Sequence, residues 1–174
     1  MARDGIHLSE NNTAKLLPGL GNDHKYHVMI SYTKEDANLV NLICKLLEPL
    51  EPKILCVEDG VIVGKAEDVA KADDLNKVIE QSLCLLVICS ENFSESKWAQ
   101  YIACQGIQKM MSAVKPSPFI QIVKCNIAYN KMPTYLSWLT YIESKPNNDE
   151  DFKKKITWAV AGETARSIDL FGGL

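Results

Sequence analysis

The side chains most able to do chemistry in this chain are its six cysteines and three histidines. The cysteines stand among apolar neighbours, and no two of them form the C-x-x-C pair of zinc and redox sites. All three histidines lie within the first 27 residues, away from the cysteines, so no metal site is predicted. His27 lies in a predicted strand without a nucleophile beside it, and we expect it to be structural. Reduced core cysteines are expected at Cys44, Cys56, Cys84, Cys89, Cys104 and Cys125.

A second chemical candidate is the segment 58–65, Glu-Asp-Gly-Val-Ile-Val-Gly-Lys, in which glycines flank an apolar triplet. It is not a phosphate-binding P-loop, because Lys65 is followed by Ala66 instead of Ser or Thr. Neither G-x-G-x-x-G nor G-x-S-x-G occurs in the chain, so the usual signatures of dinucleotide binding and of serine hydrolases are missing. An apolar loop tip between glycines favours a binding role instead.

Clusters of charged residues are the remaining candidates for a functional site. Asp73-Asp74 and the acids at 149–151 stand where helices are expected to begin, and acids there stabilise the helix dipole. The lysines at 153–155 suit a solvated helix face, and the first strand is not followed by the aspartate cluster of a phospho-receiver site. The residues themselves therefore predict no catalytic residue, no metal and no cofactor.

The elements that position these groups are best predicted from residues 83–89, seven consecutive apolar residues that suit a strand buried on both faces. A polar loop follows, with Ser94 and Ser96 as possible N-caps of a helix that starts near Trp98. Thr33 is expected to cap the first helix, with Asp36 at its third position. Further strands are predicted at 26–32, 53–57, 119–123 and 140–142, and helices at 39–47, 70–81, 98–111 and from 147–149 to Gly162.

Strand and helix alternate about five times along the chain, which predicts a parallel sheet covered by helices on both sides. The expected fold is α/β and flavodoxin-like, a three-layer α/β/α arrangement with a five-stranded parallel sheet of order 2-1-3-4-5. This architecture supports many chemistries, so it does not by itself give a function.

Length and charge indicate one domain of ordinary composition, with 174 residues, 47% of them hydrophobic, and a net charge of -3. We expect a flexible lead at 1–25, a domain at 26–162 and a tail or linker at 163–174. The interspersed charges give no reason to expect a nucleic-acid partner. No apolar run reaches the roughly 18 residues that span a bilayer, and no signal peptide is evident, so we expect a cytoplasmic protein without direct membrane insertion.

Several segments, in order, resemble the Toll/interleukin-1 receptor (TIR) domain family across about residues 25–162. Residues 27–32, His-Val-Met-Ile-Ser-Tyr, resemble its first box, (F/Y)-D-(A/V)-F-(I/V)-S-(Y/H), with His27 in place of aspartate. Residues 56–64 resemble the second box and its BB loop, usually R-D-x-x-P-G, with Val63 in place of proline. Phe152-Lys153 stands where the third box has Phe-Trp.

The most specific part of the resemblance is residues 75–98. They are similar to the family pattern of a helix ending in I-x-x-S, a hydrophobic strand, S-x-x-F and S-x-W. The residues that match this pattern are Ile79, Ser82, Ser90, Phe93, Ser96 and Trp98.

The resemblance implies a non-enzymatic cytoplasmic module of innate immune signal transduction that assembles with other TIR domains, itself included as a weak homo-oligomer. The helix at 70–81 is expected to adjoin the contact surface. Residues 61–63 would form an apolar anchor if exposed, and the alternative is that they fold back onto the sheet. The interaction loop implied by the resemblance comprises Asp59, Gly60, Val61, Ile62, Val63, Gly64 and Lys65.

Some TIR domains instead cleave NAD, which gives the alternative function of a divergent NAD glycohydrolase. The catalytic glutamate of those enzymes lies four residues after the tryptophan, and here that position is Ile102. An isoleucine cannot stabilise a developing cation, so no catalytic residue is assigned and the resemblance leans against an enzyme. An NAD pocket, if present, would use Ser31, Trp98 and Glu91, and Glu95 lies in the same loop.

A third interpretation takes the chain as the TIR part of a larger multidomain immune protein. The apolar strip at 168–171 before two glycines would then lead into a further domain.

Overall fold

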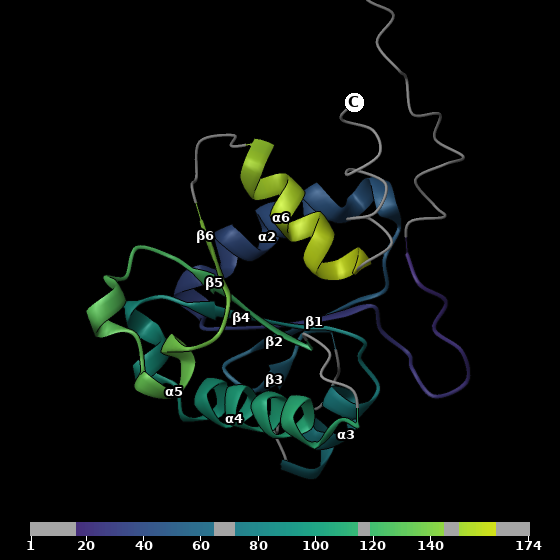
Figure 1. Cartoon of the computed structure of the whole chain (residues 1–174), viewed down its shortest axis with the longest axis horizontal. Helices are drawn as coiled ribbons and strands as arrows, with labels where there is room; N and C mark the ends of the chain where they lie inside the picture. Colours follow the sequence, from purple (N-terminus) through teal and green to yellow (C-terminus); the bar gives the residue numbers. More distant parts are fainter. Residues whose placement is uncertain (1–16, 65–71, 115–118, 145–149, 163–174) are drawn as a thin grey trace, which may run out of the picture.

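The computed structural model describes residues 17–64, 72–114, 119–144 and 150–162 and shows a three-layer α/β arrangement (Figure 1). A central sheet is covered on one side by α2 and α6 and on the other by α3, α4 and the short α5 (Figure 1). The helices are α2 (Ala37–Leu47), α3 (Ala72–Glu80), α4 (Lys97–Ser112), α5 (Thr134–Ser137) and α6 (Glu150–Ala161).

The sheet holds six strands in the order β3-β2-β1-β4-β5-β6. Four neighbouring pairs are parallel, and β3 alone runs antiparallel, against β2. The strands are β1 (Val28–Tyr32), β2 (Ile54–Glu58), β3 (Val61–Ile62), β4 (Leu85–Cys89), β5 (Ile120–Lys124) and β6 (Tyr141–Glu143). The flavodoxin-like α/β class agrees with the expectation.

The predicted strand count and order were wrong because β3 was missed. Residues 61–62 pair with the end of β2 through Val57↔Ile62 and Glu58↔Val61, and they extend the sheet by one edge strand. With β3 set aside, the parallel strands stand in the order β2-β1-β4-β5-β6. A two-residue strand carries too little alternation to be recognised from apolar periodicity.

Alternation along β1 divides the core into two clusters. Met29 faces α3 and α4, whereas Val28 and Ile30 face α2 and α6. All five residues of β4, the strand predicted from the long apolar run, are buried. Each face of this central strand is therefore covered by a helical layer, as a parallel sheet requires.

The helix caps differ in one respect from those predicted. Ser96 is the N-cap of α4, and its hydroxyl accepts a hydrogen bond from Ala99 N at 3.2 Å. Gly162 follows α6 with a positive φ of 70°. Thr33 was expected to cap α2, but it precedes a 3-10 turn (Lys34–Asp36) and donates its own hydroxyl proton to Asp36 Oδ2 at 3.1 Å. The expected cap of α6 at 147–149 lies outside the described residues.

Part of the lead that was expected to be flexible lies against the domain. Leu17 packs on the α2-side cluster. His27 accepts a hydrogen bond from Lys53 N at Nδ1 (2.9 Å), and its Nε2 lies 3.1 Å from Pro18 O. Burial lowers the pKa of His27, which favours the neutral imidazole that these two contacts need. His27 therefore joins the lead to the start of β1 and β2.

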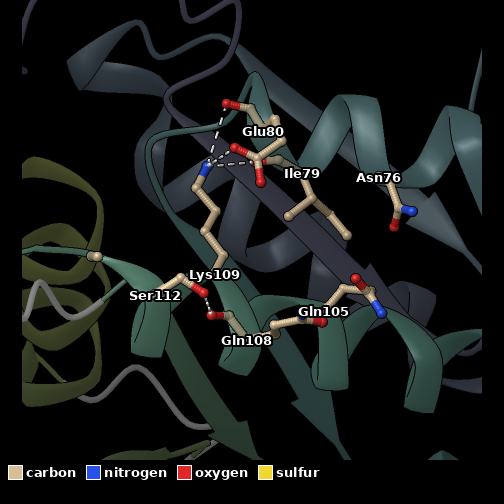
Figure 2. A pocket seen from close by; sticks show the side chains of 8 residues that line it. Asn76, Ile79, Glu80, Gln105, Gln108, Lys109 and Ser112 are labelled. Atoms are coloured by element: carbon tan, nitrogen blue, oxygen red, sulfur yellow. Dashed lines mark hydrogen bonds and ion pairs between the residues drawn. The ribbon is translucent and has the colours of Figure 1, made fainter.

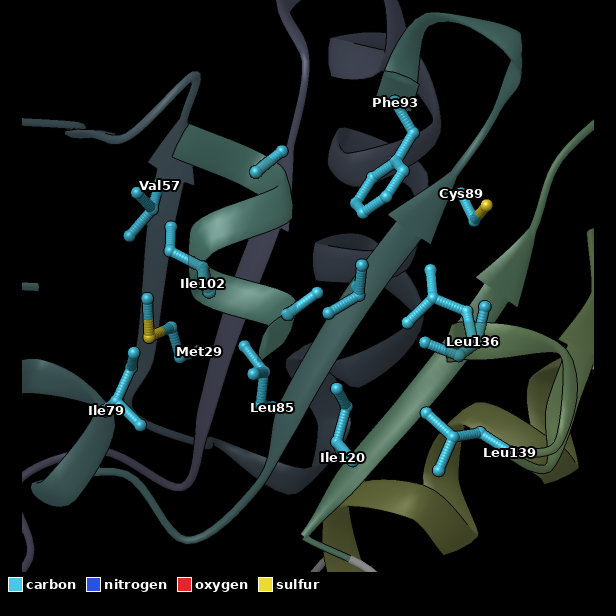
Figure 3. Packing of buried hydrophobic residues seen from close by; sticks show 14 of the residues in the cluster. Met29, Val57, Ile79, Leu85, Cys89, Phe93, Ile102, Ile120, Leu136 and Leu139 are labelled. Carbon is cyan, nitrogen blue, oxygen red and sulfur yellow. The ribbon is translucent and has the colours of Figure 1, made fainter. Parts of the chain in front are cut away.

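Phe93 completes the core on the α4 side. It lies in a 3-10 turn (Glu91–Glu95) after β4, and its side chain is fully buried (Figure 3). Its N–H donates to Ser90 O at 3.1 Å, which tightens the turn and directs the ring inward. The S-x-x-F spacing thus places an aromatic ring at the end of the central strand.

Replacing Phe93 with alanine is expected to lower the free energy of unfolding by about 3 to 5 kcal/mol, because it leaves a cavity among packed neighbours. Met111→Ala is the control, since Met111 is 71% exposed, and it should change stability by less than about 0.5 kcal/mol. Urea unfolding followed by circular dichroism measures both. Equal, small losses would contradict the assigned packing of Phe93.

Candidate functional site

The segment expected to be an interaction loop is a tight β-hairpin at one edge of the sheet. Its turn is Asp59-Gly60, with φ angles of 47° and 82°, and such left-handed pairs suit a two-residue hairpin turn. Asp59 N donates to Tyr32 O at 2.9 Å, and Asp59 Oδ2 accepts from Lys34 N at 3.1 Å. Val63 N donates to Cys56 O at 3.0 Å. The hairpin is therefore fixed to the ends of β1 and β2.

Gly60 lies directly on Trp98 of α4. A Cβ at position 60 would stand 2.5 Å from Trp98 Cβ and 2.6 Å from Trp98 Cγ, so only glycine fits. Trp98 makes an edge-to-face contact with Tyr101 at 5.7 Å, and the Tyr101 hydroxyl donates to Asn76 Oδ1 on α3 at 2.9 Å. This series of contacts connects the hairpin to both helices on that side of the sheet.

The three apolar residues of the hairpin are not equally exposed. Val63 is 54% exposed, whereas Val61 and Ile62 are half-buried. Ile62 packs against the α4-side cluster, opposite Val57. Val63, next to Gly64, is thus the most exposed of the three, while Ile62 packs mainly against the core. Lys65, the last residue of the expected loop, lies outside the described residues.

The helix expected to adjoin this surface is α3, although residues 70–71 of the predicted span lie outside the described residues. A groove of about 390 Å³ separates α3 from α4, lined by polar side chains that include Asn76, Gln105 and Gln108 (Figure 2). Lys109 closes one end, donating to the carbonyl oxygens of Ile79 (3.0 Å), Glu80 and Ser82 (Figure 2). Lys109 therefore stabilises the C-terminus of α3.

Polar groups meet where β1 and β4 end. Asp36 is buried, and its Oδ2 accepts hydrogen bonds from Thr33 Oγ1 at 3.1 Å and from Ser90 Oγ at 2.6 Å. The Ser90 hydroxyl also accepts from Asn92 N at 3.3 Å. These bonds hold together the loops that follow the two strands, which gives Ser90 of the S-x-x-F pattern a positioning role.

The residues expected to line an NAD pocket differ in their exposure to solvent. Ser31 is 1% exposed and its hydroxyl has no hydrogen-bond partner among the described residues. Glu91 is exposed and forms an ion pair with Lys131 at 3.5 Å, and Glu95 is exposed too. Trp98 lies half-buried beneath the hairpin. Of this set, Trp98 lies against Gly60 of the hairpin, whereas Glu91 is exposed on the surface.

Ile102, at which the sequence resemblance places the glutamate of NAD-cleaving TIR domains, is fully buried. Its side chain points from α4 toward the strands that carry Met29 and Val57 (Figure 3). No carboxylate is therefore available at this point of α4. The described residues also contain no group of three His, Cys, Asp or Glu side chains that could hold a metal ion.

A second candidate surface lies at the opposite edge of the sheet, beside β6, and was not predicted from the sequence. A pocket of about 240 Å³ lies between β6 and α6, with Tyr141 and Trp158 among its walls and the nearly buried Gln121 lining it. Tyr129 and Tyr141 form an exposed aromatic pair 6.3 Å apart. In the sequence, this surface could have been suspected only from the aromatic residues in segment 129–141, which lacks a clear periodic pattern.

Comparison with known proteins relates the chain to one fold. No protein-family profile and no curated protein matches its sequence. Among solved structures, it is similar to a metazoan TIR-STING receptor from C. gigas in complex with 2',3'-cGAMP, with a TM-score of 0.60 and 21% identity. The match covers 84% of this chain and 42% of the receptor chain. The chain thus has a TIR-like fold and spans less than half of that receptor.

No helix in the part of the chain that the structure describes is both long enough and apolar enough to cross a bilayer.

Gly60→Ala is expected to destabilise the domain more than Gly64→Ala, and to alter tryptophan fluorescence. Both glycines have positive φ angles, so each alanine costs roughly 1 to 3 kcal/mol in backbone strain. Only at position 60 does the new Cβ also collide with Trp98, since nothing lies within 4 Å of that added at position 64. Urea unfolding and emission spectra of both variants measure the difference. Equal stabilities with unchanged emission would show that the hairpin does not rest on Trp98.

Proposed function

We propose that this protein is a TIR-type signalling module that acts by assembling with other TIR domains in innate immune signal transduction. The observation that carries the proposal is the rigid hairpin that presents Val63, 54% exposed, at one edge of the sheet. An exposed aliphatic side chain on a well-fixed backbone loses little conformational entropy on binding, which suits a contact anchor.

The two edges of the sheet support a head-to-tail mode of assembly. The hairpin edge carries an exposed valine, whereas the β6 edge carries the pocket beside Tyr141 and Trp158. The pocket is large enough to admit an aliphatic side chain. Because the two surfaces differ, a contact between them is heterologous and can repeat along an open filament or close into a ring.

The partners of this assembly are proposed to be other copies of the chain and TIR domains of receptors or adaptors. The α3–α4 groove adjoins the hairpin through Asn76 and Tyr101 and supplies polar groups for the rim of the contact. We place this module in the cytoplasm, where such signalling domains act. No cofactor is required for this function.

The similar protein from C. gigas is named a TIR-STING receptor, and the match covers 42% of its chain. This supports the further proposal that the present chain is the TIR part of a longer immune protein. The strip at 168–171, from which a linker would start, lies outside the described residues.

A second candidate function, NAD cleavage, is favoured by one observation. The buried hydroxyl of Ser31 has no hydrogen-bond partner among the described residues, and Ser31 lies near the end of β1, in register with Val57 of β2. An unpaired buried hydroxyl costs about 1 to 3 kcal/mol, and such groups often mark functional sites. Nicotinamide release from NAD, measured at high protein concentration, separates this candidate from a pure assembly module.

Val63→Asp is expected to weaken self-association at least tenfold, about 1.4 kcal/mol, because a desolvated carboxylate would replace the apolar anchor. Folding should not change, since Val63 is more than half exposed. Ile62→Asp is a poorer test because Ile62 packs on the core. Concentration-dependent sedimentation measures the association.

The matched control for this variant is Val114→Asp, since Val114 is fully exposed and belongs to the end of the α4 region instead of the hairpin. It should associate like the native chain. A native chain that stays monomeric at high concentration, or equal association by the two variants, would contradict the homotypic form of the proposal.

Thr140→Arg is expected to block assembly from the opposite edge, because Thr140 is exposed and lines the β6 pocket. Each of the variants Val63→Asp and Thr140→Arg retains one intact surface. Their mixture should therefore form a heterodimer and stop there, while each alone stays monomeric. Growth of the mixture into long assemblies, or no association in it, would refute head-to-tail contact between these two surfaces.

A further inference from the structure

Gln121 is a polar residue inside an otherwise apolar part of β5. Residues 120–123 of this strand are all buried, and the other three are aliphatic. Gln121 is in register with Leu86 of β4, and alternation directs its side chain, like that of Val123, to the face that α2 and α6 cover. It is only 6% exposed. The strand therefore buries a carboxamide where its neighbours contribute aliphatic side chains to the core.

The Gln121 carboxamide makes no side-chain hydrogen bond within the part of the chain that the structure describes, although it carries both donors and acceptors. Other buried polar side chains, such as those of Asp36, Ser82 and Ser90, are bonded within the fold. A buried amide without a partner lowers stability, so its presence needs a reason. Gln121 also lines the pocket beside β6, through which a ligand can reach its amide.

The walls of this pocket are mainly apolar and aromatic. Ile142 of β6 is buried, and Trp158 and Ala159 lie on the flank of α6 next to its buried stripe. Thr140 and Lys155 are exposed and form the rim. A single buried amide between apolar walls is the arrangement that fixes the orientation of a small ligand.

The charges around the pocket favour a neutral ligand. Lys155 forms an ion pair with Asp151 at 2.7 Å, and no carboxylate of the described residues lines the pocket. An aliphatic group would leave the Gln121 amide unpaired, and a sugar would bury several hydroxyl groups against Ile142 and Trp158. A flat aromatic ring with a donor and an acceptor side by side avoids both costs, because it stacks on an indole and pairs with a carboxamide. Nucleobases have this chemistry.

We propose that the pocket between β6 and α6 binds the base of a free nucleoside or nucleotide, with Gln121 pairing with the donor–acceptor edge of the base and Trp158 stacking on its face. Adenine suits this pairing, because the glutamine oxygen accepts from its 6-amino group while the glutamine nitrogen donates to a ring nitrogen. The volume of about 240 Å³ is below the roughly 300 to 1,000 Å³ of pockets for drug-sized molecules, so the base enters and the ribose stays at the rim. The site uses none of Ser31, Glu91 and Trp98, and therefore differs from the NAD pocket considered above.

A bound base would occupy the pocket that the proposed head-to-tail contact uses, so it would also compete with assembly. This consequence rests on the proposed function, whereas binding of the base does not. Val63→Asp leaves the pocket intact and removes the apolar anchor at the opposite edge of the sheet. Binding can therefore be measured in this variant apart from any association.

The test titrates the ¹⁵N-labelled full chain with adenosine, in the Val63→Asp variant and in dilute native protein. Nuclear magnetic resonance follows the side-chain amide signals of Gln121 and the indole N–H of Trp158, and both should shift in a saturable way. Purine riboside lacks only the 6-amino group and offers no donor to the glutamine oxygen, so it should bind at least tenfold more weakly. No saturable shift with millimolar adenosine, or equal binding of the two nucleosides, would overturn the proposal.

Gln121→Met separates a binding role from a structural one, because it replaces the amide with an apolar side chain of similar length. Affinity for adenosine should fall at least tenfold, while stability in urea should stay equal or rise, since an unpaired buried amide is removed. Gln105→Met, at a half-buried glutamine in the α3–α4 groove, is the matched control and should bind adenosine as the native chain does. A Gln121→Met chain that loses stability but keeps its affinity, or weaker binding in Gln105→Met alone, would contradict the assigned site.

Discussion

The close contact between the Gly60 backbone and the Trp98 indole is the constraint on which the candidate interaction surface depends. It brings the edge hairpin of the sheet onto the first turn of α4, at a distance that leaves no room for a Cβ. Trp98 then contacts Tyr101, which bonds to Asn76 of α3. A hairpin on a sheet edge would otherwise be free to fray, because it has hydrogen-bond partners on one side only. Its attachment to two helices makes the exposed Val63 part of a rigid surface.

The polar groups at the ends of β1 and β4 likewise hold the neighbouring loops in fixed positions. Asp36 accepts from both Thr33 and Ser90, so the loop after each strand is tied to a single buried carboxylate. A carboxylate held by two hydroxyl donors in a buried position has little freedom to act as a general base, since those bonds would have to break first. At the carboxyl end of the sheet, where many α/β proteins bind ligands, this protein therefore uses its conspicuous acid to position loops.

How far the sequence predicts the fold depends on the kind of pattern each element carries. The central strand β4 is evident as an apolar run, since burial on both faces leaves it no polar positions. β3 is too short for that signal, although Asp59-Gly60 is itself a hairpin pair and marks the turn. Successive side chains of the hairpin point to opposite faces, so Ile62 faces the core and Val63 faces outward. Three consecutive aliphatic residues do not show in the sequence which of them is exposed. The pocket beside β6 combines residues distant in sequence, including Gln121 and Trp158, so only the folded chain brings them together.

The helix α4 explains why the enzymatic alternative cannot depend on position 102. Ala99, Ile102, Ala103 and Gly106 are the buried face of this helix, and small side chains let it approach the sheet closely. At Gly106 an added Cβ would lie 2.5 Å from Leu85 Cδ2. A glutamate at 102 would therefore enter an apolar, filled space, and a charged group there would cost far more than one in a solvated cleft. For a glutamate at position 102 to lie in a solvated cleft, α4 would have to move away from the sheet. The alternative of NAD cleavage would instead involve Ser31, whose buried hydroxyl has no hydrogen-bond partner among the described residues.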